Sequence, residues 1–104
     1  MIVEMRTYRL KPGAVPEYFR VYEAEGREVQ MRILGNLIGY FHSEIGTLNQ
    51  IVHMWGYESF EERQRRRALL AREPAWQSCL PKLQALIETQ ENSLLLGAPF
   101  SPIR

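Results

Sequence analysis

The chain has 104 residues, the size of one domain with a single hydrophobic core. Its net charge is only +1, so the charge gives no reason to expect nucleic acid or an anionic membrane as a partner. All 12 acidic residues are Glu, and the lack of Asp disfavours calcium loops, most magnesium–phosphate sites and Asp-dependent catalytic triads.

Membrane and export signals are not expected. Every apolar run falls short of the roughly 18 residues that a membrane-spanning helix needs. The start of the chain, MIVEMRTYRL, mixes charged and apolar residues and lacks the apolar core of a signal peptide. Cys79 is the only cysteine, so neither an intrachain disulfide nor a thiol-based zinc site is expected, and its helical apolar surroundings predict a buried hydrophobe. We expect a cytoplasmic protein.

The first half of the chain predicts a strand followed by a helix. Residues 2–10 alternate in polarity, and Lys11-Pro12-Gly13 end the strand with turn residues. From Ala14 the spacing becomes helical as far as Ile33, and the interruption at Gly26 indicates close packing or a bend. Alternation in the strand places Glu4, Arg6 and Tyr8 on one face and Val3, Met5 and Thr7 on the other.

A hairpin follows Gly35-Asn36. The segment GYFHSEIGTLNQIVHMWGY, residues 39–57, predicts two strands around a turn centred on Gly46. If residues 45–48 form the loop, the strands pair Glu44 with Asn49, His42 with Ile51, Tyr40 with His53 and Ile38 with Trp55.

Two helices and a strand complete the predicted fold. Ser59 caps a helix that runs to Glu73, with Glu62 in the position of a capping box. Pro74 begins a shorter helix through Leu83, which Pro81 bends or divides, and residues 87–96 predict the last strand. The order β-α-β-β-α-α-β is that of an α+β, ferredoxin-like fold, a four-stranded antiparallel sheet with helices on one face.

Both faces of this sheet are rich in large apolar side chains, so both must be covered. We expect the more aromatic face to be the one that the helices leave open, and a second copy of the chain to cover it. This predicts a homodimer through the sheet face. The faces are expected to carry Phe41, Val52 and Met54 on one side, and Tyr8, Tyr40, Ile51, Trp55 and Tyr57 on the other.

The chain resembles the NIPSNAP family in several motifs: RTYRLKPG at the start, SEIG, LNQ and HMW in the hairpin, Pro74-Ala75-Trp76, and PFSP near the end. The resemblance covers nearly the whole length, so residues 1–104 are expected to form a single NIPSNAP-like domain of a bacterial type. It implies a dimeric α/β barrel, a fold shared with cofactor-free monooxygenases and haem-degrading enzymes, and it implies no particular activity. The matching positions include Glu44, Gly46, Asn49, Gln50, His53, Trp55, Tyr57, Arg63 and Trp76.

Candidate chemistry centres on His42, Glu44 and His53, which share one predicted face. Two histidines and a carboxylate can form a facial triad for non-haem iron, but we favour hydrogen bonding within a half-polar sheet face. Neither a metal nor a cofactor is therefore expected. Haem cleavage is disfavoured because, unlike the haem-degrading relatives, the chain has no His in a predicted helix and no Asn in residues 2–10.

The function that we predict is binding of a small, largely apolar molecule in a cavity of the barrel. The alternative is a cofactor-independent monooxygenase-like enzyme acting on an aromatic or phenolic molecule, with His53, His42 or Glu44 as acid–base candidates. A third possibility is a purely structural interaction module with no internal void. The predicted ligand-binding residues are Tyr8, Tyr40, His42, Glu44, Asn49, His53, Trp55, Tyr57 and Arg63.

The arginine-rich segment from Arg63 to Arg67 resembles a phosphate- or RNA-binding run. Glutamates flank it at helical pairing distances, so a solvated, salt-bridged helix face is the better interpretation. Arg63 or Arg67 is expected to extend over the core with a buried stem.

Overall fold

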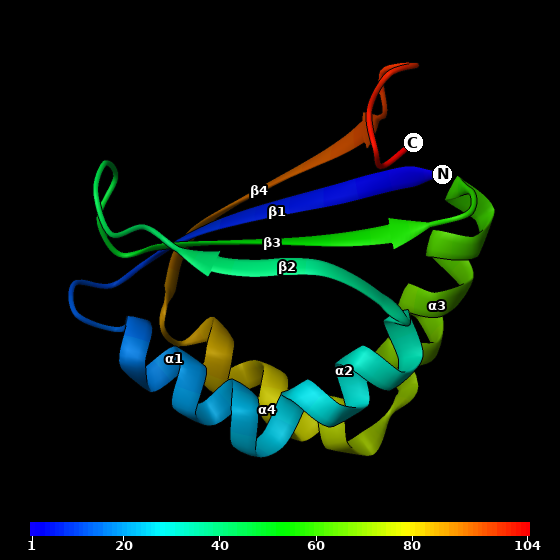
Figure 1. The fold of residues 1–104 in the computed structure, drawn as a ribbon. Helices are drawn as coiled ribbons and strands as arrows, with labels where there is room; N and C mark the ends of the chain where they lie inside the picture. Colours follow the sequence, from blue (N-terminus) through cyan, green and yellow to red (C-terminus); the bar gives the residue numbers. More distant parts are fainter.

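The computed structural model describes residues 1–104 and contains the predicted α+β, ferredoxin-like fold. Four antiparallel strands form one sheet in the order β2-β3-β1-β4, and the helices all cover one of its faces (Figure 1). The elements are β1 (Ile2–Leu10), α1 (Val15–Val21), η1 (Tyr22–Gly26), α2 (Arg27–Leu34), β2 (Asn36–His42), β3 (Gln50–Tyr57), α3 (Phe60–Arg72), α4 (Pro74–Gln84) and β4 (Ile87–Leu96).

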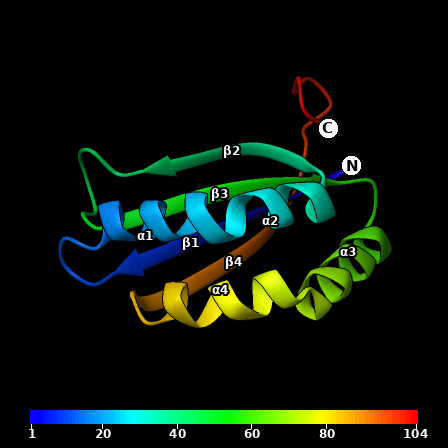
Figure 2. The same cartoon turned by 90° about the horizontal axis from the view of Figure 1, so that it is seen from below.

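The helical segment between β1 and β2 is continuous, with a π-helical turn, η1, between α1 and α2. Gly26 ends this turn, and α4 runs alongside the α1–α2 segment that contains it (Figure 2). A Cβ atom at Gly26 would lie 3.0 Å from Sγ of Cys79 and 3.1 Å from the ring of Trp76. Of the two interpretations of this glycine, close packing is therefore the one that the structure shows.

The hairpin register is confirmed at its centre and wrong at both ends. Tyr40 pairs with His53 and His42 pairs with Ile51, as predicted. Trp55 pairs with Leu37 instead of Ile38, because a bulge between Leu37 and Gly39 shifts the register. The predicted pair of Glu44 and Asn49 does not form, because residues 43–49 make a longer loop.

Asn49 holds this loop against the turn after β1. It has a positive φ of 58°, a conformation that Asn tolerates better than most residues. Its side-chain Oδ1 accepts a hydrogen bond from the backbone N–H of Gly13 at 2.9 Å, and its backbone oxygen accepts one from Leu10 at 2.7 Å. Asn49 therefore fixes the positions of two loops.

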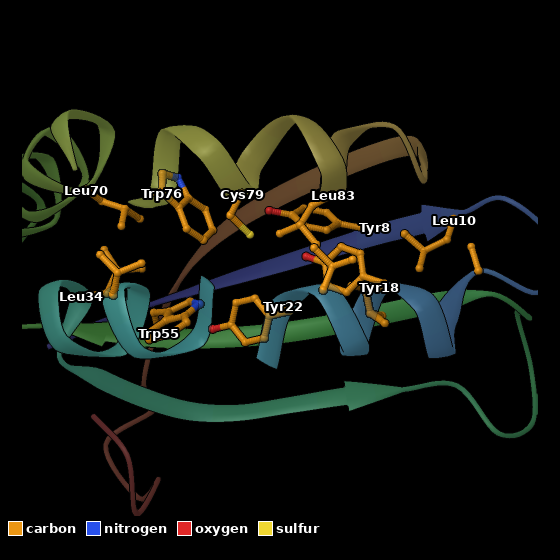
Figure 3. Close-up of a cluster of buried hydrophobic side chains, with 14 of the residues drawn as sticks. Tyr8, Leu10, Tyr18, Tyr22, Leu34, Trp55, Leu70, Trp76, Cys79 and Leu83 are labelled. Atoms are coloured by element: carbon orange, nitrogen blue, oxygen red, sulfur yellow. The ribbon is translucent and has the colours of Figure 1, made fainter. Parts of the chain in front are cut away.

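The predicted assignment of the sheet faces is wrong. The aromatic face is the one that the helices cover, and the side chains expected to lie open are in the core instead. Alternation along a strand shows which residues share a face, but the handedness of the crossover from β1 to β2 decides which face the helices cover. Figure 3 shows Trp55 and Tyr8 directed from the sheet toward the helices, where Trp76, Cys79 and Leu83 project from α4.

The open face of the sheet carries a smaller apolar set. Val3, Met5, Val52 and Met54 are partly exposed there, and Phe41 is 53% exposed. No helix in the structure is both long enough and apolar enough to span a membrane.

Candidate functional site

A fully buried carboxylate, that of Glu4 on β1, is the centre of a polar cluster beneath α3. Its Oε2 atom accepts hydrogen bonds from Arg6 at 3.1 Å, from Arg63 at 2.5 Å and from Asn92 at 2.7 Å. Burial acts to raise the pKa of Glu4. The hydrogen bonds from Arg63 and Asn92 and the charges of Arg6 and Arg67 outweigh it, and lower the pKa to about 2. Glu4 is therefore ionised at neutral pH.

The arginines around Glu4 outnumber it. Arg6 and Arg63 both form salt bridges with Glu4, whereas Arg67 has no carboxylate within 4.0 Å and its buried Nη1 atom has no hydrogen-bond partner. Burial and the positive charge of Arg6 lower the pKa of Arg67. Three guanidinium groups and one carboxylate give this cluster a net charge of +2, because Glu4 is the only carboxylate paired with them.

His53, on β3, lies beside this cluster with only 1% of its surface exposed. Its ring stacks on Tyr40 at a centroid distance of 4.4 Å and meets the edge of Tyr8 at 5.0 Å. Trp55 Nε1 lies 2.8 Å from His53 Nδ1. Because an indole N–H can only donate, Nδ1 must accept, and we assign the imidazole proton to Nε2 from this hydrogen bond.

The Nε2–H group of His53 is a buried donor without a partner. Burial and the charges of Arg6 and Arg67 lower the pKa of His53 to about 3. The imidazole is therefore neutral at pH 7, and in this tautomer it offers a hydrogen bond at Nε2 instead of accepting a proton there.

A cavity of about 200 Å³ lies next to these groups, between the sheet and the helices. Its polar wall includes Arg6, Arg67 and His53, and its apolar wall includes Trp76 and Leu83, which Figure 3 shows projecting from α4 into the space between α4 and the sheet. The remaining lining residues come from β1, β4 and three helices: Tyr8, Tyr18, Gln30, Leu80, Gln84, Ile87 and Gln90.

A larger groove of about 530 Å³ lies between the α1–α2 segment and β2. It is open to solvent, and none of the buried side-chain atoms that lack a partner belongs to its lining residues. The smaller, more enclosed cavity is therefore the candidate site.

The structure brings some of the predicted site residues together and separates others. Tyr8 and His53 line the cavity, while Tyr40 and Trp55 contact His53. Tyr57 is buried on the same face of the sheet, and Arg63 binds Glu4, so the prediction that Arg63 or Arg67 extends over the core is confirmed.

Three predicted residues lie elsewhere. His42 is exposed and packs on Phe19, Glu44 is exposed in the loop, and Asn49 anchors the loop to Gly13. His42, Glu44 and His53 accordingly do not form a group able to hold a metal ion.

The predicted site residues did not include the charged half of the site, Glu4, Arg6 and Arg67, although Arg67 was one of the two arginines expected over the core. Glu4 and Arg6 alternate with Tyr8 along β1, so all three share one face. Burial of that face requires partners for both charges, because an unpaired buried charge is costly. This alternation was the available signal, but the assignment of the face to a dimer interface obscured it.

Comparisons with known proteins agree with the fold. A structure of protein Atu4242 from Agrobacterium tumefaciens is 52% identical, with a TM-score of 0.97 over the full length of both chains. A NIPSNAP-like domain protein from Burkholderia xenovorans is 48% identical, covers 97% of this chain and 88% of its own, and has a TM-score of 0.93. SnoaB, a cofactor-independent oxygenase from Streptomyces nogalater, shares the fold at a TM-score of 0.67 with 18% identity, over 97% of this chain and 96% of its own.

Longer proteins contain a similar segment. The NipSnap homologue of Dictyostelium discoideum is 35% identical over 96 residues, which cover 89% of this chain and 41% of the relative. Drosophila melanogaster NipSnap is 34% identical over 103 residues, 97% of this chain and 36% of the relative. The chain thus spans about two fifths of the length of these curated relatives. Since the model of the NIPSNAP family also matches residues 3–102, the chain belongs to the NIPSNAP family.

Proposed function

We propose that this chain binds a small molecule in the cavity between the sheet and α4. The observation that carries the proposal is that two lining residues, His53 and Arg67, each hold a buried polar atom without a partner. Buried polar groups in native proteins almost always have partners, so such atoms beside a cavity favour a bound molecule. The space suffices for a compact ligand, because an engineered apolar cavity of about 150 Å³ binds benzene.

Native mass spectrometry of the protein as purified tests this proposal, followed by screening of small fragments for binding. We expect a defined extra mass or a fragment that binds, and loss of that binding in Leu80→Trp, which fills the cavity. Leu69→Trp is the matched control, because Leu69 is exposed on α3 outside the cavity, and it should retain the binding. Binding that survives in both variants, or no binding of any fragment, would contradict the proposal.

We also propose that two copies associate through the open face of the sheet. Support comes from the apolar side chains exposed on that face, among them Val52, Met54 and Phe41, which a second sheet would cover. Sedimentation of wild type and of Val52→Glu tests this. The variant should shift the protein to monomers, and a wild type that is monomeric at all concentrations would refute the dimer.

The second candidate function is cofactor-independent oxygenation of a phenolic molecule in the same cavity. The specific observation in its favour is the neutral His53 Nε2–H next to Arg6, since such donors stabilise a phenolate oxygen. The likeness to SnoaB concerns the fold alone. Oxygen uptake with a panel of dihydroxyaromatic compounds tests this activity, and it should fall in His53→Asn. Binding of a fragment without any oxygen uptake would contradict the oxygenase and support the binding function.

A further inference from the structure

We propose that the molecule held in the cavity is a compact acid, about one ring in size, whose anionic group is bound by Arg67, Arg6 and His53. This inference rests on the proposed binding function and specifies its ligand class. Three properties of the site support it: its charge, the direction of its unused hydrogen bonds, and its size.

Arg67 carries the excess positive charge of the cluster. Arg6 and Arg63 share the single carboxylate of Glu4, and no carboxylate remains for Arg67. Buried charges are normally paired, because removing an ion from water costs several kcal/mol unless a counter-charge compensates it. Both Arg6 and Arg67 line the cavity, whereas Glu4 does not. An anion in the cavity would therefore lie beside the excess positive charge.

The unused hydrogen bonds point to the same class of ligand. Two of the buried atoms without a partner belong to residues that line the cavity, His53 Nε2 and Arg67 Nη1, and both are donors. Tyr8 Oη already accepts from Arg6 Nε at 2.7 Å, which leaves its own hydrogen free to donate. Three donors on residues that line one cavity favour a ligand group rich in acceptors, and a carboxylate is such a group.

The size and the apolar wall define the rest of the ligand. A volume of about 200 Å³ exceeds, by roughly the volume of one or two waters, the cavity of about 150 Å³ that binds benzene. Trp76, Leu80 and Leu83 provide a hydrophobic surface for a ring, opposite the basic groups on the sheet and α3. A neutral apolar ring would fit this space but would leave the donors and the charge uncompensated.

Titration calorimetry at neutral pH with benzoate and benzamide tests the proposal, because the two probes share size and shape and differ in charge. We expect benzoate to bind wild type at least tenfold more tightly than benzamide. Arg67→Met should remove this preference, while Arg72→Met keeps it. Arg72 is the matched control, because it lies on the same helix, is exposed and does not line the cavity.

Thermal unfolding of the unliganded variants provides a second measurement that does not depend on the probe. Arg67→Met removes a partly buried charge that forms no salt bridge, so its Tm should rise by about 4 °C or more, whereas Arg72→Met should change little. A fall in Tm would show that Arg67 is already compensated within the protein, and would overturn the proposal.

The binding results separate this proposal from the function on which it rests. Equal binding of benzoate and benzamide, or a benzoate preference that survives in Arg67→Met, would overturn the acidic ligand and leave small-molecule binding intact. Failure of both probes to bind wild type would also overturn the one-ring acid. In that case a bound neutral molecule, detected as extra mass in the native spectrum of wild type and absent from Leu80→Trp, would still support the proposed function.

Discussion

The pH dependence of stability provides a direct test of the environment of His53. An unfolded chain protonates its histidines near pH 6.5, but in the folded protein burial and the charges of Arg6 and Arg67 lower the pKa of His53 to about 3, despite the opposing charge of Glu4. Between these values the unfolded state binds a proton that the folded state does not. The contribution of a neutral His53 to stability is therefore fully present above about pH 6.5, and it decreases as the pH falls below that value.

The magnitude follows from one proton. The free energy of unfolding should change by up to about 1.4 kcal/mol per pH unit. Lowering the pH from about 6.5 to 5 should therefore cost about 1 kcal/mol or more of stability. This window isolates His53 from Glu4. The stabilising contribution of Glu4 begins to fall only as the pH drops below its unfolded pKa of 4.5, and it is lost as the pH falls through about 2.

Urea unfolding at several pH values and one protein concentration, followed by tryptophan fluorescence, measures this slope. His53→Asn keeps an acceptor for Trp55 and has no titratable group, so the slope attributable to His53 should disappear between pH 6.5 and 5. His42→Asn is the control, since it replaces the other, exposed histidine and should retain the slope. If His53→Asn and wild type lose stability in parallel, the assignment of a neutral, buried His53 is incorrect.

Substitutions at three further positions test polar contacts and packing within the fold, each by the shift of the urea midpoint. Glu4→Gln should lower stability by about 3–5 kcal/mol, because it leaves the surrounding arginines without their counter-charge. Gly26→Ala should cost about 1–3 kcal/mol through the contact with Cys79, although Ala itself favours helix by about 1 kcal/mol. Asn49→Ala should cost about 1–3 kcal/mol and Asn49→Gly less, since glycine retains the positive φ while both lose the hydrogen bond to Gly13.

The fold follows from the sequence because its signals are local. Turn residues, helical spacing and strand alternation predicted the order of the elements, and the turn around Gly46 predicted the pairing of Tyr40 with His53. The bulge between Leu37 and Gly39 was missed, although a glycine within a strand, here Gly39, often marks a bulge. The assignment of faces failed because burial of Trp55 under helices depends on the crossover from β1 to β2 and not on the strand that carries Trp55.

The site was less predictable than the fold, because its residues meet through tertiary packing. The run from Arg63 to Arg67 looks uniform in the sequence, yet Arg65 and Arg66 pair with Glu62 while Arg63 and Arg67 face the sheet. Spacing of four residues groups the inward pair on one side of α3. It does not identify Glu4, 59 residues earlier in the chain, as the partner of Arg63.

The excess positive charge of this cluster lowers the stability of the free protein, and that cost favours a bound anion. A domain of this size is stable by only about 5–15 kcal/mol, so a partly buried arginine that forms no salt bridge uses a noticeable fraction of that stability. Water in the cavity can accept hydrogen bonds from Arg67 and His53, but it brings no charge and leaves the excess positive charge of the cluster in place. An anion accepts these hydrogen bonds and also compensates the excess positive charge. The free protein therefore gives up stability at Arg67 that a bound acid would restore, and for this reason Arg67→Met is expected to be more stable and less able to bind.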